Sequence, residues 1–224
     1  MSEDNWGSMD EFQVQRLKEM LIVVDENDRV IGAESKMNCH LNKNIEKGLL
    51  HRGFSVLLFS SENKLLLQQR AETKYIFPGD HPLYKPLEME ESNAIGMKWA
   101  AKNKLYSLTF SKTILCGSQI SLDDITLVSR THYKLCSDEV WGEHEIGYLL
   151  LVRKDVSLNP DPKEVKDCIY VTKEELKDLL EQETKDKVKL SGWFHLIANH
   201  FLLKMWDNFN DLNLFAEPDK IYRV

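Results

Sequence analysis

The sequence lacks the cysteine patterns that mark a disulfide-stabilised or zinc-finger protein. Its four cysteines, Cys39, Cys116, Cys136 and Cys168, are scattered through 224 residues and form no CxxC pair. No apolar leader follows the polar start of the chain at residues 1–4. Because secreted proteins typically carry a leader and often paired cysteines, we expect a reduced intracellular compartment, either the cytoplasm or the peroxisome.

Long apolar runs and an excess of basic residues are missing too. No stretch approaches the roughly 20 apolar residues of a membrane-spanning helix, so we expect no membrane insertion. The formal net charge of -7 argues against nucleic acid as a partner, because nucleic acid requires a basic surface. An anionic small molecule would need a local pocket of basic side chains. The sequence does not determine the oligomeric state, and a monomer is favoured.

No linker rich in proline, glycine or serine divides the chain, and no internal repeat is present. Short apolar runs predict strands, and apolar residues at helical spacing predict helices. The predicted strands are residues 20–24, 30–33, 49–59, 64–70, 125–133, 143–152 and 169–171, and the predicted helices are 94–107, one that opens at 172 and 191–206. We therefore expect a single α+β (mixed α/β) domain over residues 11–224, after a flexible N-terminus at residues 1–10.

The ends of these elements carry recognisable signals. Thr172 and Glu175 have the spacing of a capping box, and Ser92 or Asn93 would cap the helix at 94–107. The first two strands, and the next two, are expected to form hairpins. The segment with Lys36 and His40 indicates a polar connection, and residues 109–122 indicate an irregular loop.

Two glutamates stand at the entrance to the apolar run at residues 147–152. Glu143 and Glu145 are two apart in a predicted strand, so their side chains project from the same face. Two neighbouring carboxylates at a buried strand need a cation, a proton or a metal, whereas a solvated strand end needs nothing. Three histidines upstream, His40, His51 and His81, complete a nitrogen and oxygen set suited to a divalent transition metal.

These residues lie in segments that together resemble the eukaryotic type I isopentenyl-diphosphate delta-isomerases, a branch of the Nudix fold. The segments are residues 36–40 (KMNCH), 47–52 (KGLLHR), 77–79 (FPG), 81–83 (HPL) and 141–145 (WGEHE). The resemblance continues through residues 159–162 (NPDP) and 220–224 (KIYRV), and it covers the chain from residue 17 onward. It implies a Nudix-type sandwich of mixed β-sheet and helices.

The resemblance also implies a metal centre. One divalent ion, zinc or manganese, would be bound by His40, His51, His81, Glu143 and Glu145. Glu145 would in addition transfer a proton. The implied reaction converts isopentenyl diphosphate to dimethylallyl diphosphate by a 1,3-allylic proton shift, a step of isoprenoid biosynthesis.

The implied substrate contacts are basic and aromatic. Lys36, Arg70, Lys74 and Lys104 match or nearly match the positions that hold the diphosphate, and Tyr133 and Trp193 match aromatic positions around the hydrocarbon. Chemistry agrees with this division, because protonating an unactivated alkene creates a tertiary carbocation that aromatic faces stabilise. Basic side chains would supply the local field that an acidic chain otherwise lacks.

The chain departs from the family pattern at two places. The family carries its catalytic cysteine in a segment between the FPG turn and the HP pair, but here Gly79 is followed by Asp80 and then His81. Leu108 stands where the family has a magnesium-binding glutamate, and a leucine cannot bind a hard cation. We therefore expect weak or absent catalysis, and magnesium with the diphosphate is in doubt.

Two alternatives follow from these departures. The chain could be a non-catalytic pseudoenzyme that keeps a metal or prenyl-diphosphate site. It could also be a Nudix diphosphate hydrolase, although Leu108 and the missing glutamates of that motif argue against the required magnesium cluster.

Overall fold

The computed structural model describes residues 11–70, 94–109, 120–160, 162, 165–184, 190–209, 211 and 215–224. Its strands are β1 (Met20–Val24), β2 (Val30–Ser35), β3 (His51–Phe59), β4 (Leu65–Arg70), β5 (Ile125–Cys136), β6 (Gly142–Arg153), β7 (Val165–Val171) and β8 (Ile221–Arg223). The helices are α1 (Glu11–Leu17), α2 (Lys36–His40), α3 (Asn42–Ile45), α4 (Ile95–Thr109), α5 (Lys173–Thr184), α6 (Gly192–Ile197) and α7 (Leu203–Asp207), with a π-helical segment η3 (Ala198–Leu202) between the last two.

The strands form one eight-stranded mixed sheet. Its main path runs β2-β1-β3-β6-β5-β8, while β4 leaves β3 to pair with β7. The pairs β3–β6 and β5–β8 are parallel, and the other pairs are antiparallel. β6 lies between two long partners and is buried along most of its length, as expected for a nearly continuous apolar run.

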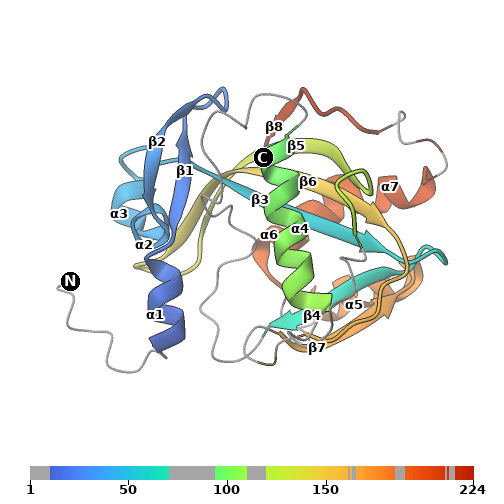
Figure 1. Ribbon diagram of the computed structural model, residues 1–224. Helices are drawn as coiled ribbons and strands as arrows, with labels where there is room; N and C mark the ends of the chain where they lie inside the picture. The colour runs from blue at the N-terminus through green and yellow to red at the C-terminus, as the bar shows by residue number, and fades with distance from the viewer. Residues whose placement is uncertain are drawn as a thin grey trace.

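Helices cover both faces of the sheet, which confirms the mixed α/β sandwich (Figure 1). On one face, α4 packs through Met97 and Leu105 against a core that includes Tyr148 and Leu150 of β6. On the opposite face, α5, α6, η3 and α7 pack against Leu149 and Leu151 of β6. The alternation of side chains along β6 therefore divides the interior into two cores. No helix within the described residues is long and apolar enough to span a membrane.

Several local expectations are confirmed. The β1–β2 hairpin forms with Met20 opposite Ser35, and β3 continues into β4 through the pair Phe59–Leu65. The capping box is present, because the Thr172 backbone N–H donates to Glu175 and the Glu175 N–H donates to the Thr172 hydroxyl. These are interactions between near neighbours, which local sequence patterns predict best.

Other elements differ from the expectation. The segment with Lys36 and His40 is two short helices, α2 and α3, because the Ser35 hydroxyl accepts from the Asn38 N–H and caps α2. Strand β5 ends at Cys136 instead of residue 133, and β7 begins at Val165 instead of residue 169. Helix α4 continues to Thr109, beyond the predicted end at residue 107. Strand β8 and helix α1 were not expected at all. The candidate caps Ser92 and Asn93 and most of residues 109–122 lie outside the described residues.

A buried carboxylate joins the β1–β2 turn to the centre of the sheet. Asp28 adopts φ 65°, and its carboxylate accepts hydrogen bonds from Arg52 at 2.6 Å, from Arg130 at 2.8 Å and from the Tyr148 hydroxyl. Burial and the Asp28 charge raise the pKa of Tyr148, so this phenol stays protonated and donates. The cluster ties the turn to β3, β5 and β6 on the face that α4 covers.

Replacing Asp28 by Asn should destabilise the protein by about 3–5 kcal/mol, because two guanidinium groups would lose their buried counter-charge. Urea unfolding at neutral pH measures the change. Glu62→Gln is the matched control, since the Glu62–Lys64 ion pair is exposed and should leave stability unchanged. An Asp28→Asn midpoint equal to that of the control would show that the cluster contributes little.

Candidate metal and active site

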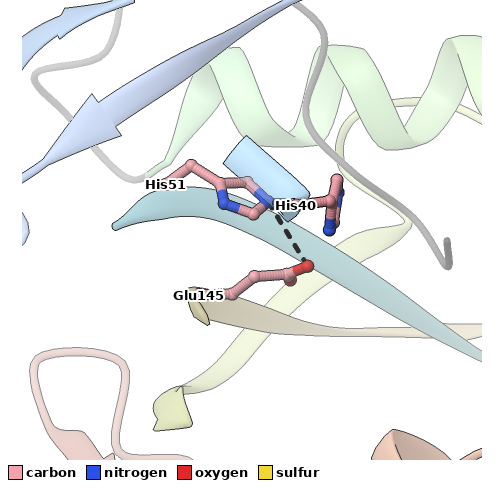
Figure 2. A group of neighbouring side chains, drawn as sticks. All are labelled: His40, His51 and Glu145. Carbon is pink, nitrogen blue, oxygen red and sulfur yellow. Dashed lines mark ion pairs between the residues drawn. The ribbon is translucent and has the colours of Figure 1, made fainter. Parts of the chain in front are cut away.

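Three buried side chains from three separate elements meet at one end of the central strands. His40 is the last residue of α2, His51 is the first residue of β3, and Glu145 lies near the start of β6. One ligand atom from each lies within 4.8 Å of the others. Figure 2 shows the two imidazole rings gathered around the Glu145 carboxylate.

The register of the sheet places these residues together. His51 of β3 pairs with Glu145 of β6 in the parallel ladder, and Tyr133 of β5 pairs with Glu145 in the antiparallel ladder. Directly paired residues share a face of the sheet, so all three side chains project to the same side. Along β6 this is the side of Leu149 and Leu151, which α5 to α7 cover.

The Glu145 carboxylate is only partly satisfied. Its Oε2 accepts a hydrogen bond of 2.9 Å from the Tyr133 hydroxyl. Its Oε1 lies 3.4 Å from His51 Nε2, is buried, and makes no hydrogen bond to any residue that the structure describes. Because a buried carboxylate oxygen without a hydrogen bond is costly, this oxygen is suited to bind a cation.

The His40 ring is also oriented in a way that suits binding of a cation. Its Nδ1 lies 2.9 Å from the Gly142 carbonyl oxygen, and a carbonyl can only accept, so Nδ1 carries the proton and Nε2 keeps the lone pair. Metal-binding histidines are commonly held in this way by a backbone carbonyl. His40 and His51 meet edge to face, with ring centroids 4.8 Å apart. Two imidazoles and one carboxylate fit a divalent transition metal.

Two glycines make room for this arrangement. A Cβ atom at Gly53 would lie 1.9 Å from Glu145 Oε2, so the missing side chain leaves the carboxylate its place across β3. A Cβ atom at Gly142 would lie 2.5 Å from Asn42 Oδ1 and 2.7 Å from the Leu135 carbonyl oxygen. Neither glycine was predicted to have a role, although Gly142 stands directly before the two glutamates Glu143 and Glu145.

The other candidate residues are only partly placed. Glu143 is buried two residues before Glu145, but it is not part of the group of three. Lys36 begins α2, and Lys104 lies on α4. Trp193 lies on α6, whose first residue Gly192 approaches Leu135 of β5. His81, Lys74 and the side chains of Arg70 and Leu108 lie outside the described residues.

A second histidine pair lies on the opposite face of the sheet. His144 stands between Glu143 and Glu145, so strand alternation turns it away from them. Its Nε2 lies 3.0 Å from His132 Nε2, and its Nδ1 lies 3.0 Å from the Leu49 carbonyl oxygen. Burial lowers the pKa of both rings, which keeps them neutral and hydrogen-bonded to each other. Strand alternation alone would have separated His144 from the metal candidates.

Comparison with known proteins decides the family. No family model matches the chain. Human isopentenyl-diphosphate delta-isomerase 2 is 52% identical over 231 residues, and the match covers 100% of both chains. The chain belongs to the isopentenyl-diphosphate delta-isomerase family. Bovine isopentenyl-diphosphate Delta-isomerase 1 is 51% identical over the same length and coverage. A Nudix hydrolase from M. smegmatis covers 88% of this chain and 96% of its own at 10% identity, with a TM-score of 0.36, too low to support an argument.

The alignments with the relatives are longer than this chain. The alignments with the human and bovine isomerases extend over 231 positions, whereas this member of the isomerase family has 224 residues. The isomerases therefore carry residues that are absent here. The shortened stretch between Gly79 and His81 is one place where the sequence indicates such a loss.

Replacing Gly142 by Ala should weaken zinc binding on the order of tenfold or more, because the new methyl group would displace either Asn42 or the Leu135 backbone. Chelator competition measures the dissociation constant. Gly32→Ala is the control, since nothing lies within 4 Å of a Cβ atom there. Equal zinc affinity in the two variants would contradict the close-packing argument.

Proposed function

We propose that this chain isomerises isopentenyl diphosphate to dimethylallyl diphosphate by a 1,3-allylic proton shift. The observation that carries the proposal is the buried Glu145 carboxylate, held by Tyr133 and facing His51 and His40. The family supports the same reaction, since its named relatives are isopentenyl-diphosphate delta-isomerases. Glu145 is the proposed proton-transfer residue.

The proposed isomerisation requires a group that transfers a proton next to the hydrocarbon chain of the substrate. One carbon of the alkene gains a proton and another loses one, so the intermediate is a tertiary carbocation. The Tyr133 hydroxyl donates to Glu145 Oε2 and so fixes this oxygen. Glu145 Oε1 is left to face the metal or the proton of the substrate. The faces of Tyr133 and Trp193 are proposed to stabilise the cation.

The metal centre is proposed to hold the carboxylates of Glu143 and Glu145 in place. His40, His51 and Glu145 would hold one divalent ion, zinc or manganese, with Glu143 and His81 as further proposed ligands. When bound, such an ion supplies positive charge that offsets the cost of burying carboxylates. Glu143 and Glu145 are only 4% and 3% exposed, so water offers them little compensation.

The diphosphate is proposed to contact Lys36, Arg70, Lys74 and Lys104. A net charge of -7 gives the chain no general attraction for an anion, so recognition depends on local cations. Magnesium with the diphosphate is not part of the proposal, because Leu108 offers no oxygen ligand at the family's position.

We propose further that catalysis is slow. The family uses a cysteine opposite the glutamate, and Asp80 and His81 follow Gly79 with no cysteine between them. Among the cysteines that the structure describes, Cys39 is buried on α2, Cys136 is exposed at the end of β5 and Cys168 lies on β7. None of these three stands in the segment where the family carries its cysteine.

A proton-exchange assay in deuterated water tests both statements. Isopentenyl diphosphate should acquire deuterium at a rate about 10² to 10⁴ lower than with a relative that carries the cysteine, the range lost with one acid–base group. Glu145→Gln should abolish the remaining exchange, while the surface control Glu62→Gln should leave it unchanged. Turnover equal to that of the relative would remove the proposed impairment, and exchange surviving in Glu145→Gln would remove its proton-transfer role.

The missing cysteine also supports a second candidate, a non-catalytic protein that keeps the metal or diphosphate site. Metal analysis tests the proposed centre, and the exchange assay together with a phosphate-release assay separates these two candidates from a third, a Nudix hydrolase. We expect one zinc or manganese ion for each chain, lost in His51→Ala. Stoichiometric metal and diphosphate binding without exchange would favour the pseudoenzyme, and phosphate release would favour the hydrolase. No stoichiometric metal would contradict the proposed centre.

A further inference from the structure

The segment that carries His40 runs beside the turn that leads into Glu143 and Glu145. His40 Nδ1 donates to the Gly142 carbonyl oxygen, Leu41 forms an antiparallel bridge with Trp141, and the Asn42 N–H donates to the Val140 carbonyl oxygen at 2.9 Å. Residues 40, 41 and 42 thus meet residues 142, 141 and 140 in antiparallel order. This short ladder connects the segment of His40 to strand β6, which carries Glu145.

The Asn42 side chain extends the ladder by one more contact. Its Nδ2 donates to the Asp138 carbonyl oxygen at 2.8 Å and lies 3.6 Å from Cys136 Sγ. Its Oδ1 fills the space beside Gly142 where a Cβ atom would stand. One amide therefore contacts the start of the turn and its end.

The turn that receives Asn42 is itself ordered. Asp138 Oδ1 accepts hydrogen bonds from the backbone N–H groups of Val140 and Trp141, at 2.8 and 2.7 Å. The Ser137 N–H donates to the Trp141 carbonyl oxygen at 2.9 Å. Asn42 therefore binds a preformed turn, which makes it able to fix the position of its own segment.

We propose that Asn42 is a positioning residue for the metal centre, which holds the His40 ring against the Gly142 carbonyl and so completes the ligand group. This inference rests on the proposed metal site. Asn42 itself does not touch the ligand atoms and acts through two neighbours, His40 and Gly142. Two short helices of five and four residues have little stability alone, so the ladder and this side chain determine where His40 lies.

Zinc affinity of the full chain tests the role, measured by chelator competition in Asn42→Ala and Asn42→Asp. The first variant removes the amide, and the second places an oxygen opposite the Asp138 carbonyl oxygen, where only a donor fits. Both should raise the zinc dissociation constant about tenfold or more, the usual effect of losing a partner that orients a ligand.

Asn44→Ala is the matched control. Asn44 Nδ2 donates to the Asn38 carbonyl oxygen at 2.9 Å. This is a similar hydrogen bond from a side-chain amide, but both of its partners lie within the α2–α3 segment. We expect wild-type zinc affinity in this variant, and similar melting temperatures for all variants without metal. Unchanged affinity in either Asn42 variant, or equal loss in Asn44→Ala, overturns the positioning role. Wild-type protein that binds no zinc or manganese overturns the proposed metal centre instead.

Discussion

The parallel pairing of β3 with β6 is the constraint on which the site depends. It sets His51 opposite Glu145, and the antiparallel ladder on the other side of β6 sets Tyr133 opposite the same residue. A slip of one residue in either ladder would turn a whole set of side chains to the other face. The same register therefore brings the candidate metal ligands together and directs the apolar side chains of β3, β5 and β6 into the two cores.

Each face of these strands buries a carboxylate, and the two carboxylates differ in their hydrogen-bond partners. On the face that α4 covers, Asp28 is satisfied by Arg52, Arg130 and Tyr148. On the other face, Glu145 has one hydrogen bond from Tyr133, and its second oxygen faces an imidazole at 3.4 Å. The contrast separates a carboxylate whose oxygens are both hydrogen-bonded within the protein from one with an oxygen that could bind a cation.

Family membership and catalytic competence rest on different parts of the chain. Identity of 52% over the full length places the chain in the isomerase family, and His40, His51 and Glu145 form a group that could hold a metal ion. Between Gly79 and His81 the sequence has Asp80 alone. The fold and the group formed by His40, His51 and Glu145 can persist after such a change, because neither the sheet register nor the ladder at residues 40–42 includes that segment. The further proposed ligand His81 borders it directly.

The sequence by itself determined the family, most strands and the identity of the candidate ligands, because alternation, caps and short motifs are local signals. It did not predict strand β8 or the buried role of Asp28, since these depend on partners about a hundred residues away. It also missed α2, although the Ser35 cap of this helix is a local signal. Only the tertiary structure decided that His40, His51 and Glu145 converge. Long-range pairing sets those positions, and no local pattern encodes the distance between segments that are remote in sequence.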